Sequence, residues 1–244
     1  MSDLENLRLK VRPLLDLAAP ADALPVYYVL HHDPVRTRLY VHEDATGRAN
    51  GFVAVCQTGQ RLFQPTVVLR TPDARAAVEL LRQALVPGRP YALITTPDLR
   101  EAIAEVVEVG QVETHRVYRL DLFRFQSSIN VLVVTEQDPG GRPRFVIRSQ
   151  GEITSEAGIN WDSPHFAEVF VYTAPAAQGR GWGRAVLAAC TTWVIRSARQ
   201  PLYVAGEESA RSLRLAEAVG YVDTGVREFA CEGVCRRRRM EDEG

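Results

Sequence analysis

The second half of the chain carries a strand pattern followed by two helical patterns of apolar residues. A strand-like run at 166–173 precedes a segment at 185–195 whose apolar residues recur at helical spacing. A second helical pattern covers 210–219, and Gly220 stands where a C-terminal cap belongs. Residues 178–183, between the strand and the first helix, are expected to form a loop.

The first half shows a similar order of patterns. Helical segments are predicted at 4–17, 73–85 and 97–109, the second of them capped by Thr71 or Asp73. Strands are predicted at 26–30, 37–41, 51–56, 66–69, 91–95 and 117–123. The repeated order indicates tandem lobes related to each other, and an unrelated α/β lobe with the same order of elements is the alternative.

The loop at 178–183 reads Gln-Gly-Arg-Gly-Trp-Gly. A glycine-rich turn between a strand and a helix exposes several backbone N–H groups, and the helix dipole adds partial positive charge there. Phosphate is therefore the expected ligand. Glycines also serve in ordinary tight turns, so the loop alone leaves that alternative open.

The loop and its flanking elements resemble the acetyl-CoA-binding core of the GNAT superfamily of N-acetyltransferases, whose signature is Gln/Arg-x-x-Gly-x-Gly/Ala. The similarity extends over 145–229: paired strands at 145–154 and 156–161, the central strand, a further strand at 202–205, and a last helix that ends in Gly220-Tyr221. The resemblance implies an α/β (α+β) fold with tandem GNAT-like lobes. Each lobe would be a mixed, mostly antiparallel sheet flanked by helices.

This resemblance predicts three segments in the 244-residue chain. Residues 1–125 would form a degenerate GNAT-like N-terminal lobe, and residues 126–235 the acetyl-CoA-binding catalytic domain, with a crossing at 125–130. Residues 236–244, in which four arginines are followed by acidic residues, would be a disordered tail. The segment 71–75 of the first lobe contains no glycine, so that lobe is expected to support the second or to wall its substrate cleft without binding coenzyme A.

Acetyl-CoA is the cofactor that the resemblance implies. In the family, the amides of the glycine loop hold the pyrophosphate, and free amides of the central strand pair with pantetheine. Arg180 is expected to pair with a phosphate more readily than Arg184, and the ring of Trp182 is expected to pack. The predicted cofactor residues are Val171, Tyr172, Thr173, Gln178, Gly179, Arg180, Gly181, Trp182, Gly183, Arg184, Ser209 and Ser212.

Two positions depart from the family pattern. Ser209 stands where the family usually has an asparagine near the pantetheine, and Ala216 stands where many members have a tyrosine thought to protonate the leaving thiolate. Tyr172 is therefore a predicted proton donor, although a tyrosine on a central strand can equally be a core residue. The sequence otherwise leaves protonation of the thiolate unassigned.

Glu168 is the predicted general base, because its stretch resembles the one that bears the catalytic glutamate in the histone-acetylating branch. It lies ten residues before Gln178, one fewer than in that branch, and a shift of one residue in a strand turns a side chain to the other face unless a bulge restores it. A solvated glutamate at the strand edge is the alternative reading. His165 and Glu152 are the other candidate bases.

The predicted function is transfer of an acetyl group from acetyl-CoA to a primary amine of a small or amino-acid-like molecule by direct attack. The rival class is a non-catalytic sensor that binds coenzyme A or an acyl-CoA. A nucleotide-binding domain of another type is disfavoured, because the loop lacks the Lys-Ser/Thr of a P-loop and the chain lacks the Rossmann glycine spacing.

Composition narrows the expected partners and compartment. The net charge of −1 favours neither nucleic acid nor an anionic membrane as a partner. The resemblance to the GNAT superfamily implies a small-molecule amine acceptor, and a monomer or homodimer is expected. Four cysteines without zinc-site spacing predict free thiols and no metal. With neither a signal-peptide pattern nor a long apolar run, a cytoplasmic location is expected, and the near absence of lysine suggests a GC-rich bacterial source.

Overall fold

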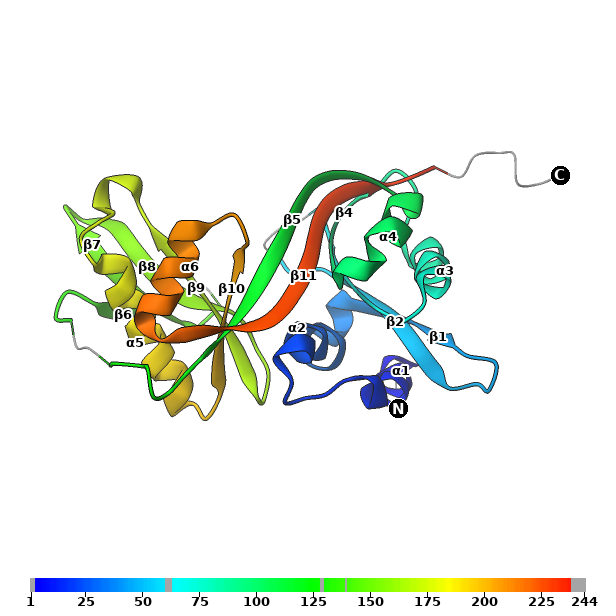
Figure 1. Cartoon of the computed structure of the whole chain (residues 1–244), viewed down its shortest axis with the longest axis horizontal. Coiled ribbons are helices and arrows are strands. Elements are labelled where there is room, and N and C mark those ends of the chain that lie inside the picture. The colour runs from blue at the N-terminus through cyan, green and yellow to red at the C-terminus, as the bar shows by residue number, and fades with distance from the viewer. Residues whose placement is uncertain (1–2, 60–62, 128–129, 139, 238–244) are drawn as a thin grey trace. The chain divides into compact units, whose positions relative to one another are not determined.

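The computed structural model of the chain describes residues 3–59, 63–127, 130–138 and 140–237. The chain forms two compact units (Figure 1). Unit 1 comprises Met1–His115 together with Arg227–Gly244, and unit 2 comprises Arg116–Val226. The predicted crossing at 125–130 and the predicted tail at 236–244 fall partly outside the described residues.

The strands form an 11-stranded mixed sheet in the order β1-β2-β3-β4-β11-β5-β10-β9-β8-β7-β6. β3 pairs with β4 in parallel, and β9 pairs with β10 in parallel, whereas most of the other pairs are antiparallel. In each half the parallel pair is joined by a crossover that contains a helix, as parallel strands require. The expected α+β class with mixed, mostly antiparallel sheets is confirmed.

Unit 1 has helices on both faces of its part of the sheet. Val53 and Val55 pack with α3 and α4, while Phe52, Ala54 and Cys56 belong to a second core with Val11 and Val26 of the N-terminal helices, because successive side chains of a strand point to opposite faces. The elements are α1 (Asp3–Val11), α2 (Ala23–Val26), β1 (Thr37–Glu43), β2 (Ala49–Cys56), β3 (Thr66–Arg70), α3 (Ala74–Ala84), β4 (Pro90–Thr95) and α4 (Arg100–Val106).

The prediction of a strand at 26–30 is wrong, because this segment is helical. α2 continues into a π-helical turn at Tyr27–His31, and Val26 and Val29, three residues apart, are both fully buried in the core of α1, β1 and β2. Tertiary burial of one helical face overrides the β-propensity of valine and tyrosine here. Two predicted helices also end early: α1 stops before Pro13, and the predicted helix 97–109 gives way to a strand after Val106.

Unit 2 covers one face of its sheet with two helices. α5 and α6 contact each other, and their apolar residues share one buried cluster with Ala157, Ile159, Ala167 and Val169 of the sheet. The elements are β6 (Val134–Gln137), β7 (Pro143–Ser149), β8 (Glu152–Asp162), β9 (Phe166–Thr173), α5 (Trp182–Arg196), β10 (Gln200–Gly206) and α6 (Ala210–Val219). The predicted strand at 166–173 and the predicted helix at 210–219 are confirmed at their stated bounds.

Two long strands, β5 (Val107–Leu120) and β11 (Tyr221–Cys235), belong to both units and are neighbours in the sheet (Figure 1). β5 passes from unit 1 to unit 2 after His115, and β11 passes from unit 2 to unit 1 after Val226. The last part of β11 pairs with β4, from Phe229 opposite Thr95 to Val234 opposite Pro90. Each unit therefore contains a strand segment from the other half of the sequence. The division at 125/126 stays a prediction about the two sequence lobes.

Within the described residues, no helix is long and apolar enough to cross a membrane.

Candidate functional site

A pocket of about 420 Å³ lies in unit 2, between β9, β10, the loop before α5, and α6. All the predicted cofactor residues except Tyr172 and Arg180 line it. Tyr203, Arg211 and Leu215 also line it and were not identified from the sequence. The predicted loop, strand end and helix start thus meet in one place, while the assignment of cofactor contacts to them stays a prediction.

The pocket lies where two parallel strands separate. β9 and β10 are in register from Gln200 opposite Phe166 to Tyr203 opposite Val169. Residues 170–173 of β9 and 204–206 of β10 continue beyond this register, and Val171 and Thr173 line the pocket on the β9 side. Since alternate backbone groups of a strand point toward each neighbour, those of 170–173 that face the split can pair with an extended ligand. We call this separation the fork; Tyr203 stands at its closed end.

The loop before α5 needs glycine for its conformation at two positions. Gly179 and Gly181 have φ angles of +79° and +75°, which side-chain-bearing residues rarely adopt. A Cβ atom at either position would meet no atom within 4 Å, so packing does not explain these glycines. Gly181 is also the N-cap of α5, whose first backbone N–H groups have no acceptor inside the helix. The loop therefore presents open space beside free donors at a helix N-terminus, which suits an anion.

Gln178 connects the loop to the strand and to the last helix. Its Nε2 donates to the carbonyl oxygen of Thr173 at 3.3 Å, and its Oε1 accepts a hydrogen bond from the guanidinium of Arg211. Arg211 thereby brings a positive charge from the first turn of α6 to the pocket. The available sequence signal was an arginine between the two expected pocket residues Ser209 and Ser212.

The two loop arginines have different positions. Arg184 lines the pocket, whereas the guanidinium of Arg180 lies over the ring of Trp182 at 5.1 Å from its centroid, a cation–π arrangement. The ring of Trp182 itself lines the pocket and packs against the core of unit 2. Arg184 and Arg211 are thus the cations among the pocket-lining residues.

Tyr203 and Ser212 form a hydrogen-bonded pair in the pocket. The phenolic oxygen of Tyr203 lies 2.7 Å from Oγ of Ser212, and the tyrosine is only 3% exposed. Burial raises the pKa of Tyr203, and the hydrogen bond from Ser212 partly opposes that rise. Ala216, one turn further along α6, is fully buried. Tyr203 was not predicted as a site residue, because the sequence pattern around it is that of an ordinary core position of a strand.

Glu168 is held by two donors at the start of β9. Its Oε1 accepts from Nδ2 of Asn160, and its Oε2 accepts from Nε1 of Trp161, both at 2.6 Å. The register of β8 with β9 shifts between Ile159 and Trp161, and this bulge places both donors beside the carboxylate. By strand alternation Glu168 faces away from the side of β9 that carries Val171 and lines the pocket.

The remaining candidate residues also lie outside the pocket lining. Tyr172 is 53% exposed and, by alternation, shares the face of Glu168. His165 is exposed in the turn before β9, where its carbonyl oxygen accepts from the backbone N–H of Gln200. Glu152 is exposed at the start of β8. Their predicted roles as bases or donors stay predictions.

Comparison with known proteins identifies the family of this region. Residues 104–221 match the sequence model of the Acetyltransferase (GNAT) family. This stretch is a GNAT acetyltransferase domain. Among curated proteins, none matches the chain.

Solved structures share the fold over nearly the whole chain. A Drosophila protein superposes with a TM-score of 0.66 at 14% identity, covering 96% of this chain and 97% of that one. A GCN5-related N-acetyltransferase from Kribbella flavida gives 0.60 at 14% identity, with coverages of 93% and 98%. A tandem GNAT protein from the clavulanic acid biosynthesis pathway gives 0.56 at 14% identity, with coverages of 97% and 94%. The predicted tandem GNAT fold is confirmed by these similarities.

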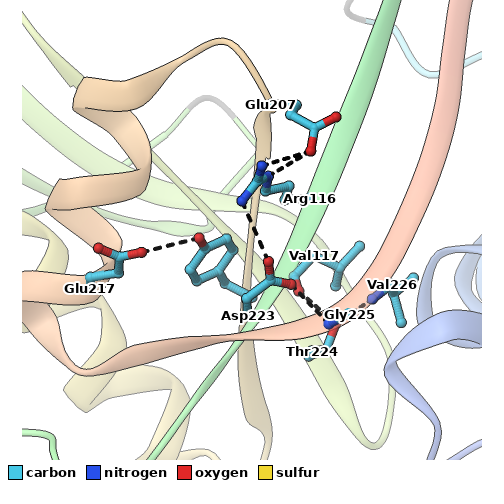
Figure 2. Close-up of polar contacts among 9 residues, drawn as sticks. Arg116, Val117, Glu207, Glu217, Asp223, Thr224, Gly225 and Val226 are labelled. Carbon is cyan, nitrogen blue, oxygen red and sulfur yellow. Dashed lines mark hydrogen bonds and ion pairs between the residues drawn. The ribbon is translucent and has the colours of Figure 1, made fainter.

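An ion-pair network anchors the loop at the start of α6 in the GNAT domain. Figure 2 shows the guanidinium of Arg116, on β5, between Glu207 and Asp223; the N–O distances are 2.7 Å and 3.7 Å. The hydroxyl of Tyr118, also on β5, donates to Glu217 of α6 at 3.2 Å. Glu207 directly precedes the segment that carries the pocket residues Ser209 and Arg211, so β5 helps to position the α6 side of the pocket.

The cysteines are free and buried. Burial raises the pKa of Cys56 and of Cys190 to about 12 and that of Cys231 to about 11, so these thiols stay protonated and poorly nucleophilic near neutral pH. Within the described part of the chain, no three His, Cys, Asp or Glu side chains are grouped closely enough to hold a metal ion.

Proposed function

We propose that the GNAT domain is an acetyl-CoA-dependent N-acetyltransferase that transfers an acetyl group to a primary amine of a small or amino-acid-like molecule by direct attack. One observation carries this proposal: the glycine loop and the fork of β9 and β10 open into the same pocket. An anion site at one end and unpaired strand edges at the other suit a long ligand with a phosphate group and an amide-containing chain.

The residues of the pocket fit acetyl-CoA by an independent criterion. Gly179 and Gly181 adopt conformations that leave open space beside the helix N-terminus, and no packing requirement accounts for them. The backbone of 178–183 would hold the pyrophosphate, with Arg184 and Arg211 adding positive charge. The edge of β9 at 170–173 would pair with the pantetheine chain. When bound, acetyl-CoA supplies an acyl group on a thioester.

The fork lets the two reactants approach from opposite faces of the sheet. The pocket lies on the face covered by α5 and α6, whereas Glu168 lies on the other face, opposite Leu202 and one residue before the last registered pair. An amine that reaches the fork from the face of Glu168 would meet a carboxylate already oriented by Asn160 and Trp161. We propose Glu168 as the base that accepts the amine proton, directly or through water. His165, Glu152 and Tyr172 remain the alternative proton carriers.

A coenzyme A or acyl-CoA sensor is the second candidate function. Ser209 and Ala216 favour it, because they replace family residues expected to assist the transfer step. A sensor would bind coenzyme A in the same pocket without releasing thiol from acetyl-CoA.

Thiol release and thermal stabilisation separate these functions. The full chain is incubated with acetyl-CoA and a panel of small amines and amino acids, and free thiol is followed with time. Amine-dependent thiol release supports the enzyme. Stabilisation by coenzyme A with no release on any amine supports the sensor, and no stabilisation contradicts both.

A further inference from the structure

Transfer of an acyl group from a thioester leaves a sulfur that must receive a proton. A free thiol has a pKa of about 8.5, so a donor placed beside the sulfur assists its departure near neutral pH. Ala216 cannot supply that proton, and the hydroxyl of Tyr172 belongs to a side chain outside the pocket lining. Another group that lines the pocket can fill this role.

Tyr203 occupies the position where such a donor is needed. It is the last residue of β10 in register with β9, so it stands at the closed end of the fork. The glycine loop lies at the other end of the same strand segment, after Thr173. A ligand with its phosphates on the loop and its chain along 170–173 points its far end, the end that bears the thioester, toward Tyr203.

The hydroxyl of Tyr203 is held at the α6 side of the pocket. Ser212 accepts or donates at 2.7 Å, and both residues line the pocket. Ser212 and Ala216 are one helical turn apart, and side chains on a helix lean toward its N-terminus. A hydroxyl carried at position 216 would therefore reach toward the turn of Ser212. Tyr203 brings a hydroxyl to that turn from the strand.

We propose that Tyr203 is the proton donor to the leaving sulfur, with Ser212 as its relay. This inference rests on the proposed transferase function. As the amine nitrogen bonds to the acyl carbon and the carbon–sulfur bond breaks, the proton of the Tyr203 hydroxyl passes to sulfur. Tyr203 then regains a proton from the hydroxyl of Ser212, which regains one from water in the open pocket. The surplus proton of the amine leaves through the base on the other face.

Titration of bound coenzyme A tests the donor without turnover. The ultraviolet absorbance of the thiolate is followed against pH for saturating coenzyme A on the full chain. A donor beside the sulfur stabilises the thiolate, so the bound thiol should have a lower pKa than free coenzyme A. Tyr203→Phe should raise that pKa by about one unit, the size expected for losing a hydrogen bond to a charged group. Tyr203→Phe should also lower kcat by at least about tenfold and change KM for acetyl-CoA little.

Tyr221→Phe is the matched control. Tyr221 is a buried tyrosine of the same core whose hydroxyl lies 2.8 Å from Oγ1 of Thr191, and it does not line the pocket. Its substitution removes a buried hydroxyl in the same way and should leave the thiol pKa unchanged.

Each result decides between the proposals. If coenzyme A does not stabilise the wild-type chain, the transferase proposal fails. If coenzyme A binds but Tyr203→Phe leaves the thiol pKa unchanged, or if only Tyr172→Phe shifts it, the assignment to Tyr203 is overturned. Should Tyr203→Phe fail to fold, Ser212→Ala keeps the ring, and it must slow reprotonation and shift the pH profile of kcat; an unchanged profile overturns the proposal.

Discussion

The two halves of the molecule use the same strand–helix junction in opposite ways. In unit 2, α5 begins after Gly181, which has no side chain, and the strands before and after this helix, β9 and β10, part beside the pocket. In unit 1, α3 begins after Asp73, whose carboxylate accepts from the backbone N–H of Arg75 at 2.9 Å. A carboxylate of the chain thus occupies the position that an anionic ligand would need.

The parallel strands of unit 1, β3 and β4, are bridged at the point where those of unit 2 separate. β3 and β4 are in register from Thr66 opposite Ala92 to Val68 opposite Ile94. Just beyond the last of these pairs, the hydroxyl of Thr95 donates to the carbonyl oxygen of Leu69 at 2.9 Å. This buried side chain satisfies a backbone carbonyl one residue beyond the last registered pair, which is where the two parallel strands separate in unit 2. A junction of this fold can accept a ligand only where the chain leaves its backbone donors and acceptors unused. This difference between the units supports the prediction that the first lobe does not bind coenzyme A.

Gly181→Glu should have the largest effect of the substitutions considered, on the affinity for coenzyme A. It places a carboxylate beside the N–H groups of α5, as Asp73 does in α3, so affinity for coenzyme A should fall by at least about 100-fold from repulsion and occupied donors. Calorimetric titration with coenzyme A measures it. Gly47→Glu is the control, because Gly47 has a φ of +78° and an equally open Cβ position, but lies outside the pocket. Equal affinities in the two variants would mean that the loop is not the anion site.

The buried carboxyl group of Glu228, in unit 1, should affect how the free energy of unfolding depends on pH. Burial raises the pKa of Glu228, which is 2% exposed with Oε2 unpaired, and the charges of Arg70 and His115 only partly oppose that rise. The folded state therefore holds this proton more tightly than the unfolded state, where the pKa is about 4.3. The resulting stability is present below that pH and is lost as the pH rises through the raised pKa.

Glu228→Gln removes this contribution. Between about pH 4.3 and the raised pKa, the free energy of unfolding of the wild type should fall relative to that of the variant by up to about 1.4 kcal/mol per pH unit. Urea denaturation at a series of pH values measures the two slopes. Parallel curves across that range would show that Glu228 titrates alike in both states.

Asp73→Ala should have the smallest effect, on stability. It tests most directly the difference between the junction before α3 and the junction before α5. Losing the N-cap of α3 should cost about 1 kcal/mol of stability, because one backbone donor loses its acceptor. Coenzyme A should still bind with a stoichiometry of one, since the turn at 71–75 has no glycine and Thr95 still closes the strands. A second equivalent of bound coenzyme A would show that the cap alone separates the two junctions.

Local patterns were sufficient to predict the elements that build the site. The glycine spacing at 178–183, the strand at 166–173 and the helix at 210–219 are short-range features, and each lies where predicted. The segment at 26–30 shows the limit of such patterns. Its valines and tyrosines have strand propensity, but burial of Val26 and Val29 on one side makes it helical.

The residues missed in the site depend on long-range contacts. Tyr203 and Arg211 have unremarkable local patterns, and only the packing of β10 against α6 and of Gln178 against α6 brings them to the pocket. The orientation of Glu168 likewise depends on a bulge in the neighbouring strand β8, which no pattern around Glu168 reveals.

The sequence by itself determined that the second half carries a GNAT-type strand, glycine loop and helix, because these depend on backbone conformations that neighbouring residues dictate. The tertiary structure decided which strands complete each unit, since β5 and β11 pair with partners far away in the chain. It also decided which side chains face the fork. Pairing and burial are properties of residues distant in sequence, so only the folded chain could show that Tyr203 closes the fork while Thr95 seals its counterpart in unit 1.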